Sequence, residues 1–234
     1  MLSNPIFVKT SFVVKEMGKD LFRKWLSYFK PQNKFFDSEI NSRLEVRWIK
    51  GRKILNTKIA NYSYGGLQEV LERGLNRIPL ENVNSVLVLG MGGGCVVDSL
   101  RNKFDYRGPI TGVEKDPVVI QIAKNEFGIH KDRQVELIEA EAKKYIIHSD
   151  RKFDLVIIDL FIDVKVPSRF YSKKFWKYIE NSVNKNGFVL FNAGVDLCEE
   201  KLDEFLERVP SSFVYQIKSE VLGTNTVIIF QKFY

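Results

Sequence analysis

The second half of the chain alternates short apolar runs with segments in which apolar residues recur at helical spacing. The apolar runs predict five strands, over residues 85–89, 110–114, 135–139, 153–158 and 187–191. Two of them, SVLVL and FDLVII, are nearly unbroken apolar runs, which is typical of parallel strands covered by helices on both faces. The alternation therefore predicts a sheet built from βα units.

Polar residues stand where two helices are predicted to begin, and the last part of the chain predicts an antiparallel pair of strands in place of βα units. Asp116 and Ser172 stand directly before helical patterns and are placed to cap them. Residues 213–218 and 226–230 predict an antiparallel pair. The predicted fold class is α/β: a Rossmann-like, doubly wound, mainly parallel sheet with an antiparallel C-terminal hairpin.

The first part of the chain predicts a separate unit. Apolar residues at helical spacing over residues 16–30 predict a helix, and alternation over 44–48 followed by a turn and a return over 53–58 predicts a β-hairpin. We therefore expect a small N-terminal helix and β-hairpin subdomain, residues 1–65, packed on a domain of residues 66–234.

Composition narrows the class of protein. At 234 residues and 44% hydrophobic content, the chain can bury one sizeable core. No apolar stretch is long enough for a membrane span, and the start lacks the layout of a signal peptide. With only two cysteines, a reducing cytoplasm is the simplest interpretation. We expect a cytoplasmic protein without a membrane partner, and without a metal, because His130 and His148 lack ligand-like spacing.

The positive charge is concentrated at the N-terminus. Residues 1–60 hold 13 Lys and Arg against 5 Asp and Glu, whereas the other 174 residues hold 23 against 24. This segment could attract an anionic partner such as nucleic acid. A solvated face is the favoured alternative, because no aromatic-basic recognition motif was identified with it.

A glycine cluster follows the first strand of the predicted sheet. Gly90, Gly92, Gly93 and Gly94 permit a tight turn into a helix and close approach of a ligand to backbone N–H groups, and Glu114 ends the next strand. A carboxylate there can accept both hydroxyls of a ribose. The pattern predicts a nucleotide-type cofactor site; the alternative is a plain turn with an exposed glutamate.

The spacing of the glycines favours one class of nucleotide. It differs from the dinucleotide fingerprint GxGxxG, and Cys95 occupies the position where that fingerprint needs glycine or alanine. An adenosyl ligand is therefore favoured over NAD. Cys95 itself lies near a helix start, where a thiol pKa can fall, but a small packing residue is the favoured interpretation.

Other polar residues follow apolar runs in the same way. In doubly wound sheets the ligand lies outside the carboxyl ends of the strands. The glycines, Glu114, residues 139–141, Asp159 and Asn192 all fall at such ends. We therefore expect them to form one site.

Several segments, taken in order, resemble a known family. VLVLGMGGG, GVEKDP, VELIEAEAKKYI and FDLVIIDLFIDVKVP are similar to motifs of the polyamine aminopropyltransferase (spermidine synthase-like) family, within the class I S-adenosylmethionine methyltransferase fold. The resemblance covers roughly residues 40–195. It implies S-adenosylmethionine or its decarboxylated form as cofactor, no metal, and a homodimer.

The resemblance also implies roles for individual residues. Glu114 would hold the ribose hydroxyls, Glu141 and the backbone N–H of Ala142 would contact adenine, and Asp159 would be catalytic. Asn192 stands where the family usually has glutamine, among the cofactor-binding residues.

The chain departs from the family at two carboxylates. Gly93 replaces an aspartate that pairs with the primary amine of the cofactor. In the catalytic loop Ile162 replaces the second aspartate, and Asp163 is displaced by one position. Asp163 is a candidate substitute acid or simply a turn former. Because a buried ammonium group needs carboxylate partners, both departures argue against the prediction of a polyamine substrate.

Three tyrosines complete the candidate site. Tyr62, Tyr64 and Tyr171 either line a substrate cavity or belong to the core.

Three hypotheses follow. The favoured one is transfer of a methyl or related group from S-adenosylmethionine to an unknown acceptor. The second is aminopropyl transfer from the decarboxylated cofactor to putrescine or another polyamine. The third is an adenosyl-binding protein without catalysis.

Overall fold

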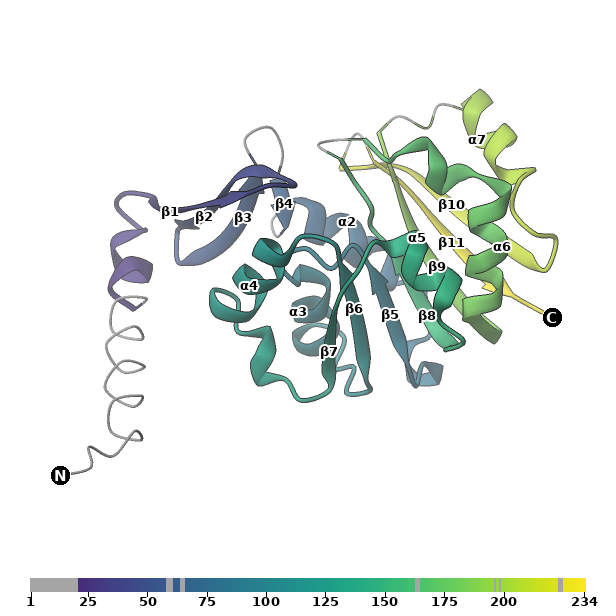
Figure 1. The fold of residues 1–234 in the computed structure, drawn as a ribbon, viewed down its shortest axis with the longest axis horizontal. Coiled ribbons are helices and arrows are strands. Elements are labelled where there is room, and N and C mark those ends of the chain that lie inside the picture. Colours follow the sequence, from purple (N-terminus) through teal and green to yellow (C-terminus); the bar gives the residue numbers. More distant parts are fainter. Residues whose placement is uncertain are drawn as a thin grey trace.

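The chain forms two sheets with helices packed around the larger one (Figure 1). The computed structural model describes residues 21–57, 61–63, 66–162, 165–195, 197, 199–222 and 225–234. The smaller sheet is antiparallel and comprises β1 (Gln32–Ser38), β2 (Ser42–Ile49), β3 (Arg52–Thr57) and β4 (Asn61–Ser63), in that order.

The larger sheet has seven strands in the order β10-β11-β9-β8-β5-β6-β7. They are β5 (Val86–Leu89), β6 (Ile110–Glu114), β7 (Val135–Glu139), β8 (Phe153–Ile158), β9 (Val183–Gly194), β10 (Phe213–Val221) and β11 (Asn225–Lys232). Strands β5 to β9 are parallel, and β11 and β10 add an antiparallel edge. This confirms the predicted fold class, and strand order reverses between β5 and β8.

Helices cover both faces of this sheet. They are α2 (Gly66–Leu75), α3 (Cys95–Asn102), α4 (Pro117–Asn125), α5 (Ala142–His148), α6 (Lys173–Ser182) and α7 (Glu199–Leu206), with 3₁₀ turns η1 (Leu80–Asn82), η2 (Ile129–Lys131) and η3 (Ser168–Tyr171).

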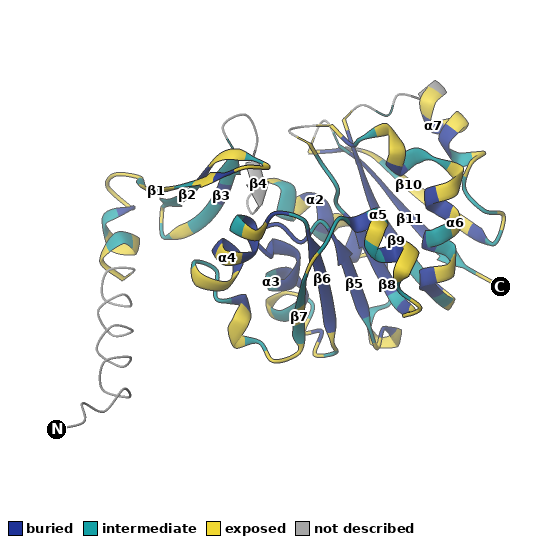
Figure 2. Ribbon diagram, viewed as in Figure 1, coloured by how far each residue is buried: buried dark blue, intermediate teal, exposed yellow. Residues whose placement is uncertain are grey.

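The side chains of the buried strands alternate between the two faces. Val86 and Val88 of β5 face one apolar cluster, which includes residues of α2 and α3, while Leu87 and Leu89 face another formed with α5, α6 and α7. Figure 2 shows β5, β6 and β8 buried along their length.

The two predicted helix caps are confirmed. The Asp116 side chain accepts a hydrogen bond of 2.8 Å from the backbone N–H of Val118, with Pro117 as the first residue of α4. Ser172 accepts one of 3.3 Å from Phe175 in α6. Each cap satisfies an N–H that the helix itself leaves unpaired.

An aromatic cluster fixes α6 and α7 against the sheet. Trp176 is fully buried, and its ring packs against Phe191, Phe205 and Phe230 at centroid distances of 4.6 to 5.7 Å. Its indole N–H donates to the carbonyl of Phe170 at 3.0 Å, so burial leaves no polar atom of the ring unpaired.

The N-terminal part contains more strand than the pattern predicts. Residues 21–26 are helical and the chain turns before Pro31, while residues 16–20 of the predicted helix lie outside the described residues. The predicted hairpin is confirmed as β2 and β3. Strand β1 was missed because its sequence, QNKFFDS, lacks clean alternation of apolar and polar residues; β4 was missed as well.

The small sheet packs on α4. Leu44, Val46 and Leu55 form a buried cluster with Val119 and Ile122 of that helix. These apolar contacts pack the N-terminal sheet directly against α4 of the larger domain.

An ion-pair cluster reinforces the same contact. Lys34 and Lys53 both reach Glu126, at 2.5 and 3.1 Å. Burial alone would raise the pKa of Glu126, but hydrogen bonds and charge from the two lysines lower it below its ordinary value.

The division into residues 1–65 and 66–234 stays a prediction, with one sheet on each side of it. Among the helices that the structure describes, none has the length and apolar character needed to cross a membrane.

Candidate functional site

The carboxyl ends of the parallel strands bring the predicted residues to one edge of the sheet. Strand order reverses between β5 and β8, so the segments after these two strands lie side by side. The backbone N–H of Asp159, after β8, donates to Leu89 O at 2.9 Å, and that of Gly90, after β5, donates to Val113 O at 3.0 Å. Ligands of doubly wound sheets bind at this reversal.

The glycine loop has a backbone that only glycine adopts easily. Gly90, Gly92 and Gly94 have φ angles of 86°, 54° and 89°. A Cβ at Gly90 would lie 2.2 Å from the carbonyl oxygen of Asp159, so the loop also passes very close to the neighbouring segment. Gly94 precedes the first turn of α3, and the loop therefore directs backbone N–H groups toward this edge.

Glu114 lies directly beneath this loop. It ends β6 and is buried, with 4% of its surface exposed. Its carboxylate accepts from Gly92 N–H at 3.1 Å, and from the N–H groups of Lys115 and Asp116 at 2.9 and 3.1 Å. Burial raises the pKa of Glu114, and the backbone hydrogen bonds offset part of that rise. The carboxylate thus ties the glycine loop to the start of α4.

Asp116 connects the same point to the N-terminal sheet. Its second carboxylate oxygen accepts from Ser38 Oγ at 2.5 Å and from Asn41 Nδ2 at 2.6 Å. Sequence reasoning missed Ser38 and Asn41, because a partner 75 or more residues distant leaves no local signal. Asp116 therefore links the turn between β1 and β2 to Glu114, because it is hydrogen-bonded to both.

Glu141 and Ala142 lie at the start of α5, as the strand ends predict. Glu141 caps the helix by accepting from Lys144 N–H at 2.9 Å, and Arg169 approaches its other oxygen at 3.7 Å. Ala142 is the first residue of α5 and is buried. Contact of either residue with adenine stays a prediction.

Asp159 and Asn192 form a hydrogen-bonded pair. Asn192 is fully buried in β9, and its Nδ2 donates to Asp159 Oδ1 at 2.9 Å, while its Oδ1 accepts from Gly194 N–H at 3.2 Å. The structure therefore places Asn192 against the predicted catalytic residue, with both its amide atoms engaged by the protein. It orients Asp159, a role that the prediction of a cofactor-binding Asn192 did not include.

The surroundings of Asp159 change its acidity. Burial raises the pKa of Asp159 from 3.8 to about 7, although the hydrogen bond from Asn192 lowers it. A carboxylate with a pKa near 7 is suited to accept and release a proton at neutral pH.

The predicted substrate residues are only partly described. Asp163, Tyr64 and the side chain of Tyr62 lie outside the described residues. Tyr171 donates from its hydroxyl to Ala193 O at 2.9 Å, and its ring packs on Phe191 and Phe205. These contacts are those expected if Tyr171 belongs to the core and does not line a substrate cavity.

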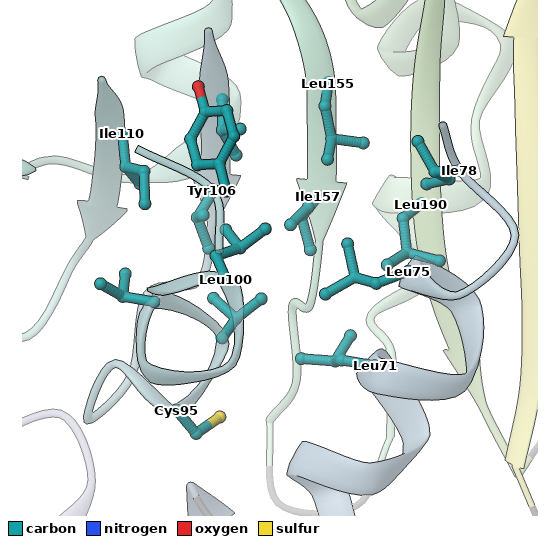
Figure 3. Close-up of a cluster of buried hydrophobic side chains, with 14 of the residues drawn as sticks. Leu71, Leu75, Ile78, Cys95, Leu100, Tyr106, Ile110, Leu155, Ile157 and Leu190 are labelled. Carbon is teal, nitrogen blue, oxygen red and sulfur yellow. The ribbon is translucent and has the colours of Figure 1, made fainter. Parts of the chain in front are cut away.

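Cys95 is a packing residue, which is the interpretation favoured from the sequence. It is 3% exposed and belongs to the apolar cluster shown in Figure 3, together with Leu100 and Leu71. Within the part of the chain that the structure describes, no group of three or more His, Cys, Asp or Glu side chains is arranged to hold a metal ion.

The Spermine/spermidine synthase domain matches residues 70–228, which include the glycine loop, Glu114, Asp159 and Asn192. The chain belongs to this family. A probable polyamine aminopropyl transferase of Bifidobacterium longum is 26% identical over 207 residues, which cover 83% of this chain and 43% of that protein. The chain thus spans less than half the length of this curated relative.

Solved structures agree on the fold. A probable spermidine synthase from Corynebacterium glutamicum superposes with a TM-score of 0.59 at 14% identity, covering 87% of this chain and 77% of that one. Human Methyltransferase-like protein 13, in complex with SAH, gives a TM-score of 0.57 at 20% identity, covering 73% and 83%. The fold is therefore shared with a probable spermidine synthase and with a methyltransferase-like protein.

Proposed function

We propose that the protein transfers an aminopropyl group from decarboxylated S-adenosylmethionine to an amine acceptor of the polyamine class. The observation that carries this proposal is the Asp159–Asn192 pair beside the glycine loop. Membership of the spermine/spermidine synthase domain family supports the same chemistry. This reverses the preference that the missing carboxylates gave to methyl transfer.

The residues fit an adenosyl group at Glu114. Its carboxylate has about four acceptor positions, of which three are used by backbone N–H groups. The fourth accepts one ribose hydroxyl, and the second hydroxyl competes with Gly92 N–H. Binding of the ribose would therefore loosen the bond between Glu114 and the glycine loop.

The acceptor must lose a proton before it can react. A bound decarboxylated donor supplies an electrophilic CH₂ beside a sulfonium; displacement by the amine lone pair forms the C–N bond, breaks the C–S bond and releases methylthioadenosine. Asp159 accepts the proton that the acceptor ammonium gives up, because its pKa of about 7 places both protonation states within reach at neutral pH. Asn192 holds the carboxylate in one orientation during this exchange.

Methyl transfer from S-adenosylmethionine is the second candidate. Gly93 favours it, because the resemblance places an aspartate at this position in aminopropyltransferases, to pair with the primary amine of the donor. A glycine leaves no anion to repel the carboxylate of S-adenosylmethionine.

The two candidates release different products. We expect incubation with decarboxylated S-adenosylmethionine and putrescine or spermidine to give methylthioadenosine, measured by liquid chromatography and mass spectrometry. S-adenosylhomocysteine formed from S-adenosylmethionine would instead support methyl transfer. If the protein bound adenosyl compounds but formed neither product with any amine, only the non-catalytic hypothesis would remain.

A Glu114→Gln variant tests the ribose contact. The variant replaces one acceptor oxygen of the carboxylate with an NH₂ donor. That NH₂ group cannot accept the backbone N–H hydrogen bonds that Glu114 accepts, and it cannot accept a hydrogen bond from a ribose hydroxyl. We expect methylthioadenosine to bind about 10- to 100-fold more weakly in calorimetric titration.

The matched control is Glu207→Gln. Glu207 is exposed and follows α7, away from the residues of the candidate site. It should bind methylthioadenosine as the unaltered protein does. Equal affinities in the two variants would remove Glu114 from the cofactor site.

A further inference from the structure

Residues 21–30 carry a group of exposed apolar side chains that the proposed function does not use. Their exposed fractions lie between 60 and 77%. We call this group the aromatic face; it consists of Leu21, Phe22, Trp25, Tyr28 and Phe29. The Trp25 ring packs against Phe22 and Phe29 at centroid distances of 6.3 and 5.4 Å, so the rings form a continuous apolar ridge. Contiguous exposed apolar surface of this kind marks an interaction site.

Leu21, Phe22, Trp25 and Phe29 are the outer part of the aromatic face, whereas the Tyr28 ring lies over the turn at Gly51, where an added Cβ would lie 2.5 Å from the Tyr28 hydroxyl oxygen. Residues 21–26 are helical, and at about 3.6 residues per turn Leu21, Phe22 and Trp25 share one side of the helix. Ser27 falls on the opposite side and is the anchor: its Oγ accepts from Gly51 N–H at 2.9 Å.

The backbone makes the same attachment, since Ser27 O accepts from Lys50 N–H at 3.1 Å. Lys50 and Gly51, the two residues that Ser27 binds, form the turn between β2 and β3. Figures 1 and 2 show this segment beside the small sheet, apart from the seven-stranded sheet, with much of its surface exposed. The attachment therefore fixes the segment to the protein while leaving the outer part of the aromatic face exposed.

Basic residues border this face. On the helix, Lys24 falls on one side of the apolar arc and Arg23 on the other, and Lys30 follows the last aromatic residue. Residues 21–30 contain no acidic residue, and residues 21–57 hold nine Lys and Arg against three Asp and Glu. The partner must therefore accept apolar rings and carry negative charge.

These features separate three kinds of partner. A second copy docking through the same face would bring the basic borders together, and like charges oppose that contact. The Trp25 ring contacts the rings of both Phe22 and Phe29, so the three rings form one cluster and not separate platforms on which successive nucleic-acid bases could stack. An apolar ridge between cations matches a helix lying in the headgroup region of an anionic bilayer.

We propose that the aromatic face inserts into the surface of an anionic lipid bilayer and docks the protein there peripherally. No apolar run in the sequence is long enough for a membrane span, and the sequence therefore predicts no membrane partner. Only a crossing helix needs such a run, whereas a surface helix needs only one apolar side. The proposal is independent of the proposed enzymatic function.

Flotation of the whole chain with lipid vesicles tests the proposal. We expect the protein to float with vesicles that mix phosphatidylcholine and phosphatidylglycerol equally, and to bind at least about tenfold less to phosphatidylcholine alone or in high salt. Tryptophan emission should shift to the blue on binding. The Trp25→Phe variant should still bind but lose most of this shift, because Trp176 is already fully buried and Trp48 is half-buried in β2 under the ammonium group of Lys53.

Surface variants keep the test separate from folding. Trp25→Ser combined with Phe29→Ser should lower vesicle binding about tenfold or more, and Lys24→Glu combined with Lys30→Glu should remove its dependence on anionic lipid. Tyr234→Ser, which changes a residue 83% exposed at the other end of the chain, is the matched control and should bind normally.

Other outcomes overturn the proposal. Equal binding of neutral and anionic vesicles would contradict the role of the basic border. A concentration-dependent dimer, lost in the Trp25→Ser and Phe29→Ser variant without vesicles present, would assign the face to a second copy. Binding of single-stranded RNA, but not of vesicles, through the same residues would assign it to nucleic acid.

Discussion

An Asp159→Asn variant is expected to keep its fold and to lose turnover by about 100- to 10,000-fold, the range that a positioned general base contributes. Asparagine has nearly the same shape and can still accept the hydrogen bond from Asn192. It cannot accept a proton from the acceptor amine. Product formation at saturating donor and acceptor measures the loss.

The same variant should be more stable at alkaline pH. The folded-state pKa of about 7 lies above the ordinary value of 3.8, so folding favours the protonated form. The stability that this form gives is complete below pH 3.8 and is lost as pH rises through 7. The whole difference corresponds to about 4 kcal/mol. Because Asp159 is partly exposed, we expect Asp159→Asn to raise the free energy of unfolding by about 1 to 3 kcal/mol at pH 8, with little change at pH 4.

Two measurements keep these effects apart. The turnover of the unaltered protein should rise with pH and level off above about 7, following ionisation of Asp159. Asp203→Asn, on the exposed side of α7, should alter neither turnover nor stability. Full turnover in Asp159→Asn would show that Asp159 is not the base, and unchanged stability at both pH values would show that its carboxyl group is not desolvated.

A Gly90→Ala variant is expected to lose about 2 to 5 kcal/mol of folding stability and most adenosyl binding. Two costs add: a residue with a Cβ is strained at a φ of 86°, and the new Cβ would lie 2.2 Å from the carbonyl oxygen of Asp159. The contacted atom is backbone, which cannot rotate away. Relief requires movement of the glycine loop or of the segment that carries Asp159, and both belong to the candidate site. Urea unfolding and methylthioadenosine titration measure the two losses.

Gly128→Ala is the matched control. Its φ of 73° is also positive, but an added Cβ would meet only the side chain of Lys131 at 3.7 Å. We expect it to lose about 1 to 2 kcal/mol, the cost of the backbone conformation alone. If Gly90→Ala were no worse than Gly128→Ala, the close approach between the two segments would have no energetic consequence.

The structure adds a connection between the N-terminal sheet and the candidate site. Ser38 and Asn41 bind Asp116, whose backbone N–H in turn binds Glu114. The small sheet is therefore more than an appendage, because its first turn helps to fix the carboxylate predicted to hold the ribose. A change in the position of this sheet would reach Glu114 through two hydrogen-bonded contacts.

Local patterns predicted the centre of the larger sheet because β5, β6 and β8 are buried on both faces. A nearly unbroken apolar run such as SVLVL or FDLVII is typical of a strand covered on both faces, and the observed strands β5 and β8 match these runs closely. Strands β1 and β4 and helix α7 were missed. Strand β1 has an exposed face and mixed composition, so tertiary contacts with β2 fix it more than its own sequence does.

The sequence by itself determined the βα order, the glycine turn after β5 and the acidic or amide residues at the strand ends, because each depends on spacing along one segment. Only the tertiary structure decided that Asn192 orients Asp159, that burial brings the pKa of Asp159 to about 7, and that Tyr171 and Cys95 pack in the core. Those properties depend on strand order and on what surrounds each side chain. Residues brought together across 33 or more positions of chain leave no periodic trace in the sequence.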